Sequence, residues 1–250
     1  MEMKTEDTFD ARAVAARQRY DEAYQSGKRG AGIVSKEDEI LIRRHSEVCL
    51  MWKGLQEDRG RRYAGCTFDN YKITNDKQRK VVAKLRQYAA DKSNFQNGVG
   101  VVLFGTKGAG KDHLLMALAY EVVKNYGVCA HWVNGVTLHA DLKRDDFNNK
   151  DSSWDWGDVN SKPSKTPILW VSDPLPPSGA LSEYQQRLLF QVIDDRYSQM
   201  LPTWLTMNVE NGSEAEARMG AQNVDRLCHG ALVIACDWES YREPLKEIHK

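Results

Sequence analysis

One glycine-rich stretch of the sequence has the residues and the spacing to bind phosphate. Gly105, Gly110 and Lys111 fit the G-x-x-x-x-G-K pattern of a phosphate-binding loop. The stretch follows an apolar run, 99–104, which predicts a buried strand, a tight turn and then a helix opened by Lys111. Glycines let backbone N–H groups approach phosphate oxygens, and a helix N-terminus adds the positive end of its dipole. The candidate nucleotide-binding residues are Gly105, Thr106, Lys107, Gly108, Ala109, Gly110, Lys111, Asp112 and His113.

Two acidic residues are candidate ligands of Mg²⁺. Asp112 stands where the pattern has the Ser or Thr that ligates the metal, and a carboxylate is a hard oxygen ligand that can replace the hydroxyl. Asp173 ends an apolar strand at 167–173, as does the acid that holds Mg²⁺ in P-loop enzymes. Pro174 follows, where many such ATPases have a Glu that orients the attacking water. We therefore expect a site that binds ATP or ADP with Mg²⁺ and hydrolyses ATP slowly.

The composition excludes several classes of protein. The 250 residues carry 35 Lys and Arg against 35 Asp and Glu, so no global basic field attracts nucleic acid and any DNA contact must be local. Five cysteines without C-x-x-C spacing predict free thiols. His45 and Cys49 lie four residues apart, but further metal ligands are not evident. Without a signal peptide or a long apolar run, the expected location is the cytoplasm, with no membrane contact.

Apolar and amphipathic segments alternate from residue 63 onward. Strands are expected at 99–104, 128–133, 167–173, 203–207 and 231–236. Helices are expected around 81–89 and at 112–126, 136–143, 181–200 and 218–227, and the polar stretch 145–165 predicts a loop. Such alternation implies an α/β fold in which helices cover both faces of a parallel sheet.

The first 62 residues read as a separate helical segment. A helix is expected at 7–25, a flexible glycine-rich joint at 26–32, and a second helix from Ser35. The second helix carries an apolar stripe, which either docks on its own domain or binds a partner; its residues are Leu41, Val48, Trp52 and Leu55. The basic stretch 59–62 that follows is interpreted as a solvated linker.

An ordered set of motifs points to a known family. The motifs lie at 66–71 (CTFDNY), 105–114, 191–197 (QVIDDRY), 202–208, 225–226 and 238–242 (WESYR). Together they resemble the DnaC-type bacterial helicase loaders, which are AAA+ ATPases and share a family with the IstB transposition helpers. The resemblance implies an AAA+ ATP-binding domain at 63–250, with a helicase-binding helical segment at 1–62 that shows only the family's general layout.

The resemblance also implies roles for single residues. Lys111 would be the phosphate-loop lysine and Asp173 the Mg²⁺ acid, while Asn208 would sense the γ-phosphate. Arg226 would be an arginine finger offered to the ATP of a neighbouring subunit, and Arg242 a second sensor in its own subunit. A finger that acts in trans requires self-association, as a ring or spiral.

The implied function is that of a replication helicase loader. Such a protein binds a DnaB-like replicative helicase, places it on single-stranded DNA and has weak ATPase activity. An IstB-like transposition helper that binds duplex DNA is one alternative, and a hydrolysis-deficient adaptor, suggested by Asp112 and Pro174, is another. Candidate DNA contacts are Lys143, Arg144, Trp154 and Trp156, although tryptophans in a polar stretch also anchor loops to a core.

Overall fold

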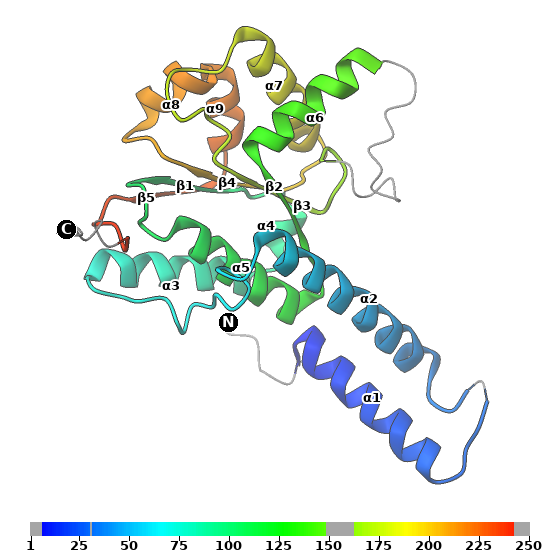
Figure 1. Ribbon diagram of the computed structural model, residues 1–250. Helices are drawn as coiled ribbons and strands as arrows, with labels where there is room; N and C mark the ends of the chain where they lie inside the picture. Colours follow the sequence, from blue (N-terminus) through cyan, green and yellow to red (C-terminus); the bar gives the residue numbers. More distant parts are fainter. Residues whose placement is uncertain (1–6, 31, 149–162, 243–250) are drawn as a thin grey trace, which may run out of the picture.

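Five parallel strands form one sheet at the centre of the computed structural model, which describes residues 7–30, 32–148 and 163–242 (Figure 1). The strands are ordered β2-β3-β4-β1-β5 across the sheet. Their bounds are β1 Val101–Gly105, β2 Ala130–Asn134, β3 Ile168–Ser172, β4 Thr203–Met207 and β5 Leu232–Cys236. All four neighbouring pairs are parallel, so the carboxyl ends of the strands meet at one edge. The predicted α/β fold is confirmed.

Helices cover both faces of this sheet (Figure 1). One face is covered by α3 (Asp76–Ala90) and α5 (Lys111–Tyr126), which pack against each other. Their apolar sides join a core that includes Trp170 and Trp204, both fully buried. The short α4 (Ser93–Gln96) leads into β1. This layer holds the helix that follows the glycine-rich loop.

The opposite face carries the other four helices of the sheet (Figure 1). They are α6 (Gly135–Asn148), α7 (Glu183–Ser198), α8 (Gly212–Met219) and α9 (Ala221–Cys228). The helix expected at 136–143 extends to Asn148, so the loop prediction is wrong for the first residues of 145–165. The single helix expected at 218–227 is also wrong, because Gly220, with φ 95°, separates two helices.

Arg196 of α7 ties the starts of two central strands to the helical layer. Its guanidinium is fully buried and donates to the carbonyls of Pro163 and Thr166 before β3. It also donates to the Pro202 carbonyl and to the Thr203 hydroxyl at the start of β4. Burial lowers the pKa of Arg196 to about 9, and the four acceptors stabilise its charged form.

The N-terminal helices form a hairpin that projects from the sheet domain (Figure 1). Thr8 caps α1 (Phe9–Gln25) and Ser35 caps α2 (Lys36–Arg59), and the two helices pack along each other. The predicted stripe faces the domain: Val48 and Leu55 are buried, and Leu41 and Trp52 are partly buried against the same clusters. The docked interpretation of α2 is therefore correct, and a partner would have to use its other faces.

All five cysteines are free thiols, as expected. His45 and Cys49 are adjacent on α2, but the described residues contain no group of three or more potential metal ligands. Among the helices of the described chain, none has the length and apolar character needed to cross a membrane. The predicted domain boundary at residue 62 stays a prediction.

Candidate nucleotide-binding site

The glycine-rich loop connects β1 to α5 at the carboxyl edge of the sheet. Gly105 has φ 123°, and a Cβ there would lie 2.5 Å from the carbonyl oxygen of Cys236 on the adjacent β5. Gly110, the N-cap of α5, has φ 85°. Both conformations favour glycine over residues that carry a Cβ. The two glycines of the pattern are thus required by the backbone path that places the N-terminus of α5 against the loop.

Lys111 lies across this loop. Its ammonium donates to the carbonyls of Gly105 (3.0 Å) and Thr106 (2.8 Å) and to the side-chain oxygen of Asn208 (2.8 Å). These bonds use all three donors of the ammonium, and Lys111 as a whole is 6% exposed. Burial lowers the pKa of Lys111, while Asp173 and Asp112 act in the opposite direction. A phosphate oxygen that approached the loop would exchange with one of these acceptors.

Asp173 and Asn208 meet because β3 and β4 are neighbours in the sheet. The Asn208 amide donates to the Asp173 carboxylate at 2.6 Å, so Asn208 bridges Lys111 and Asp173. Asp173 has φ 49°, a left-handed conformation that non-glycine residues seldom adopt and that is common at functional sites. Burial raises the pKa of Asp173, as does the nearby carboxylate of Asp112.

The Asp112 carboxylate points toward the ends of the same two strands. One oxygen accepts hydrogen bonds from the hydroxyls of Ser172 (2.8 Å) and Thr206 (3.4 Å). The same oxygen lies 3.3 Å from a terminal nitrogen of Arg59. Mg²⁺ bound with a nucleotide commonly takes one or two protein carboxylates plus phosphate oxygens and water. Asp112 and Asp173 both line the cavity described next, and their carboxylates are ligands of the kind that such a metal takes.

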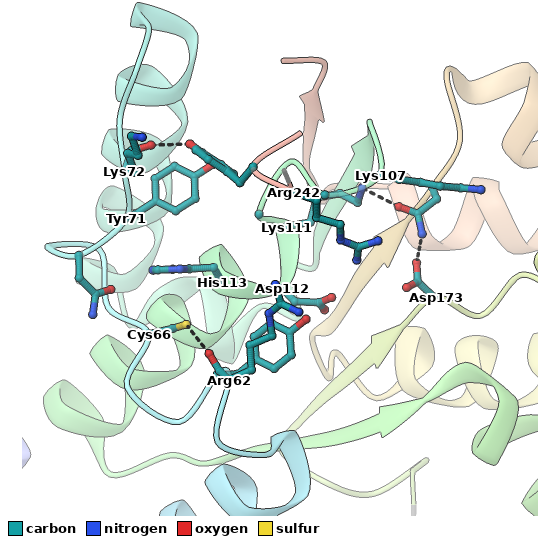
Figure 2. A pocket seen from close by; sticks show the side chains of 16 residues that line it. Arg62, Cys66, Tyr71, Lys72, Lys107, Lys111, Asp112, His113, Asp173 and Arg242 are labelled. Carbon is teal, nitrogen blue, oxygen red and sulfur yellow. Dashed lines mark hydrogen bonds between the residues drawn. The ribbon is translucent and has the colours of Figure 1, made fainter. Parts of the chain in front are cut away.

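These side chains border a cavity of about 410 Å³ (Figure 2). From the candidate residues, the cavity brings together Lys107, Gly108, Gly110, Lys111, Asp112, His113, Asp173, Asn208 and Arg242. The segment after β5 makes two hydrogen bonds to the loop. The indole N–H of Trp238 donates to the Ala109 carbonyl, and the backbone N–H of Tyr241 donates to the Gly108 carbonyl. These bonds fix the loop and bring Arg242 near it.

Four candidates do not line this cavity: Gly105, Thr106 and Ala109 belong to the loop itself, and Arg226 lies elsewhere. It is on α9, its Nε donates to Asp194 of α7 at 3.0 Å, and its guanidinium lies over the ring of Tyr197 at 4.8 Å. It borders a different, small cavity. A residue that completes a neighbouring subunit's site has to lie away from its own, and this position meets that condition.

The far end of the cavity is aromatic, and the sequence analysis assigned no role to most of its residues. Tyr71 donates to the Ala109 carbonyl at 3.0 Å, and His113 and Tyr241 contact its ring edge-on. Burial lowers the pKa of His113, whose Nε2 lies 2.9 Å from the Thr67 carbonyl. Tyr71 belongs to the CTFDNY motif at 66–71, and this motif is the sequence feature that could have predicted the aromatic end of the cavity.

The basic stretch 59–62 lies closer to the site than the sequence predicts. Its interpretation as a solvated linker is wrong for Arg59, whose side chain is only 5% exposed and faces Asp112. Arg62 also lines the cavity (Figure 2), and so does Tyr63. A single-sequence pattern gives no signal for this contact, because it joins segments that lie far apart in the chain.

Residues 63–248 match the family described as IstB-like ATP binding protein. The chain belongs to this family. The match covers the sheet domain, the glycine-rich loop and the segment that carries Arg242, and it leaves the N-terminal hairpin outside.

Curated relatives of this IstB-like chain carry the name replicative helicase loader DnaC. The protein of Buchnera aphidicola (subsp. Acyrthosiphon pisum) is 27% identical over 188 residues, which is 74% of this chain and 72% of the relative. The Escherichia coli K12 protein is also 27% identical, over 72% of this chain and 70% of the relative.

Solved structures show the same fold. A structure described as the DnaC helicase loader aligns with a TM-score of 0.62 and 22% identity, over 70% of this chain and 99% of that one. DnaI aligns with a TM-score of 0.56 and 21% identity, over 70% of this chain and 93% of that one. AMPPCP-bound DnaA from Aquifex aeolicus aligns at 0.53 and 16% identity, over 70% of this chain and 50% of that one. An AAA+ fold is therefore shown.

Proposed function

We propose that this chain is an ATP-dependent loader of a replicative helicase. The observation that supports this most directly is the bridge Lys111–Asn208–Asp173 at the carboxyl edge of the sheet, in a chain whose curated relatives are helicase loaders. In this proposal the three residues act together as the phosphate-loop lysine, the γ-phosphate sensor and the Mg²⁺ acid. A protein of this role works on chromosomal or mobile-element DNA and so in the bacterial cytoplasm.

In the proposed reaction, the nucleotide lies in the cavity with its phosphates on the loop. Backbone N–H groups of the loop and Lys111 bind phosphate oxygens, and Arg242 contacts them from the same subunit. Asp112 and Asp173 would hold Mg²⁺, which neutralises phosphate charge when bound. Pro174 supplies no water-orienting carboxylate, so hydrolysis by the isolated protein should be slow. Asn208 would sense whether the γ-phosphate is present.

The helical hairpin is the proposed helicase-binding surface. Several large apolar side chains remain exposed on it, although the predicted stripe is buried against the domain: Val14, Tyr24, Ile40, Leu50 and Met51. Exposed apolar side chains on paired helices suit the apolar groove of a protein partner. The ring or spiral of loaders would form through Arg226 contacts to the next subunit.

Single-stranded DNA is the proposed nucleic-acid partner. Lys143 is exposed on α6. The side chain of Arg144, and Trp154 and Trp156, lie outside the described residues, so their part in DNA binding stays a prediction.

Two other functions have specific support. The family model is named for IstB, so a transposition helper that binds duplex DNA is the second candidate. The pairing of Asp112 with Arg59, together with Pro174, supports an ATP-binding adaptor that does not hydrolyse.

The decisive test measures ATP binding, hydrolysis and loading with one set of proteins. Wild type and Lys111→Ala are assayed with Mg²⁺, with and without single-stranded DNA, and then with a DnaB-type helicase on closed circular single-stranded DNA. A loader binds ATP and places the helicase on the circle, and Lys111→Ala loses both. Binding without turnover or loading favours the adaptor, and polymerisation on duplex DNA favours the transposition helper. Absence of nucleotide binding would contradict all three.

A further inference from the structure

A buried arginine that the proposed mechanism does not use lies beside the phosphate loop. Arg59 is the last residue of α2, and its side chain is 5% exposed. One terminal nitrogen lies 3.3 Å from the oxygen of Asp112 that Ser172 also contacts. The N-terminal hairpin therefore places a positive charge at the carboxylate that departs from the phosphate-loop pattern.

Aromatic rings hold this guanidinium in place. Its central carbon lies 4.2 Å from the ring centre of Tyr63, 4.4 Å from that of Trp132 and 4.7 Å from that of Trp170. Cation–π contacts of this kind are strongest when the cation is desolvated, as here. The guanidinium is thus enclosed, and it has little freedom to leave Asp112.

One of these rings, that of Trp132, is connected to Asp112 by hydrogen bonds. The indole N–H of Trp132 donates to the Ser172 hydroxyl at 2.9 Å, and that hydroxyl donates to Asp112 at 2.8 Å. Arg59 itself lies over the Trp132 ring and faces Asp112, so it contacts both ends of this chain of hydrogen bonds. A change in the position of Arg59 would therefore affect the Asp112 carboxylate directly, through the ion pair, and indirectly, through Trp132 and Ser172.

The hydrogen-bonding capacity of Arg59 is not used fully within the protein. Among the described residues, neither Nε nor Nη2 has a hydrogen-bond partner, although both atoms are buried. Nη2 contacts Asp112 at ion-pair distance only. The guanidinium is thus held by its ion pair with Asp112 and by ring contacts more than by hydrogen bonds.

The charges around the loop suggest what Arg59 does. Asp112 and Asp173 place two carboxylates where a polyphosphate would bind, and the positive charges of Lys111 and Arg242 offset the charge of Asp173. In phosphate loops that carry Ser or Thr after the lysine, the second negative charge is absent. Like charges at close range oppose binding unless a cation lies between or beside them. Arg59 is the cation that the fold places at Asp112.

We propose that Arg59 is the built-in counter-cation of Asp112 and thereby sets how strongly nucleotide binding depends on Mg²⁺. This inference rests on the proposed function, whose nucleotide site it deepens. With Arg59 in place, Asp112 is neutralised and the loop accepts a metal-free nucleotide. Without Arg59, the Asp112 carboxylate would repel the phosphates unless the positive charge of bound Mg²⁺ offset it. Because Arg59 ends α2, the hairpin that carries it takes part in this control.

The test compares the affinity for a fluorescent ADP analogue in EDTA and in saturating Mg²⁺, at constant ionic strength. Arg59→Met should weaken binding at least about tenfold in EDTA, which is about 1.4 kcal/mol, and change it little in Mg²⁺. Arg59→Lys, which keeps the charge, should stay near wild type in both. Arg61→Met is the matched control, because Arg61 is exposed two residues further along and does not line the cavity.

A second background shows whether the effect depends on Asp112. In Asp112→Ser, the carboxylate is gone, so adding Arg59→Met should no longer increase the dependence on Mg²⁺. Equal weakening by Arg59→Met in EDTA and in Mg²⁺, or the same loss in the Asp112→Ser background, would overturn the inference and leave Arg59 a structural residue. If wild type binds no nucleotide in either condition, the proposed function falls as well. Urea denaturation of each variant confirms that the proteins compared are folded.

Discussion

The ammonium of Lys111 donates a 2.8 Å hydrogen bond to the side-chain oxygen of Asn208. This contact joins the helix after the first strand to the end of the fourth, two strands that are adjacent in the sheet although they lie far apart in the sequence. A γ-phosphate that bound Lys111 would also meet the Asn208 amide. We therefore expect this bond to change with the state of the nucleotide.

The first prediction concerns Asn208. In Asn208→Ala we expect ATP to bind nearly as in wild type, and hydrolysis to fall by about 100-fold, as when one preorganised donor to developing charge is removed. Asn208→Asp keeps the acceptor for Lys111 and loses the donor to Asp173, so it separates the two contacts. Equilibrium nucleotide binding and single-turnover hydrolysis provide the measurements. Unchanged hydrolysis in the alanine variant would contradict a role for Asn208 in hydrolysis.

The second prediction concerns Arg226, which pairs with Asp194 on the surface and not with its own loop. Arg226→Ala should bind ATP normally and lose about 10³-fold in hydrolysis stimulated by helicase and DNA, the range known for arginine fingers. Arg226→Lys should also lose most of it, because a lysine lacks the planar fork.

A mixing experiment determines whether Arg226 acts across a subunit boundary. Lys111→Ala lacks a working loop but still offers Arg226, and Arg226→Ala has the reverse defect. If the finger acts in trans, mixed assemblies regain part of the stimulated hydrolysis that neither variant has alone. Mixtures that stay as inactive as their components would contradict the assignment.

The sequence predicts those features that depend on neighbouring residues or on strand order. Asp173 and Asn208 end two apolar strands, and in a parallel sheet such ends meet. The split at Gly220 was missed because an isolated glycine is tolerated within a helical pattern. Arg59 was missed for a different reason: its contacts to Asp112 and Trp132 depend on how α2 docks, and no local pattern encodes that placement.

The third prediction concerns Arg196, the buried guanidinium that contacts the starts of β3 and β4. Arg196→Met should lower the free energy of unfolding by about 3 kcal/mol or more, because four carbonyl and hydroxyl acceptors lose a charged donor. Urea denaturation followed by tryptophan fluorescence measures this. Arg187→Met, on the same helix but exposed, is the control. Equal stability of the two variants would show that the Arg196 bonds contribute little.

The last prediction concerns His131 on β2 and the stability at mildly acidic pH. Burial, assisted by the positive charge of Arg196, lowers the pKa of His131 from its ordinary 6.5 to about 4. Between these values the unfolded chain binds a proton that the folded chain does not, so stability falls as the pH falls. The contribution reaches about 3 kcal/mol near pH 4, at 1.36 kcal/mol per pH unit. Burial also lowers the pKa of His113 and His139, which adds to the loss on acidification.

The measurement is the free energy of unfolding in urea at pH 7.5 and at pH 5 for wild type and His131→Gln. The variant cannot take up the proton, so the difference between the two pH values should shrink by about 2 kcal/mol, the part of the titration completed by pH 5. His229→Gln is the matched control, because that ring is exposed. The comparison uses the difference between pH values, so a general loss of stability in His131→Gln does not affect it. An undiminished difference would mean that His131 accepts its proton in the folded state as readily as in the unfolded chain.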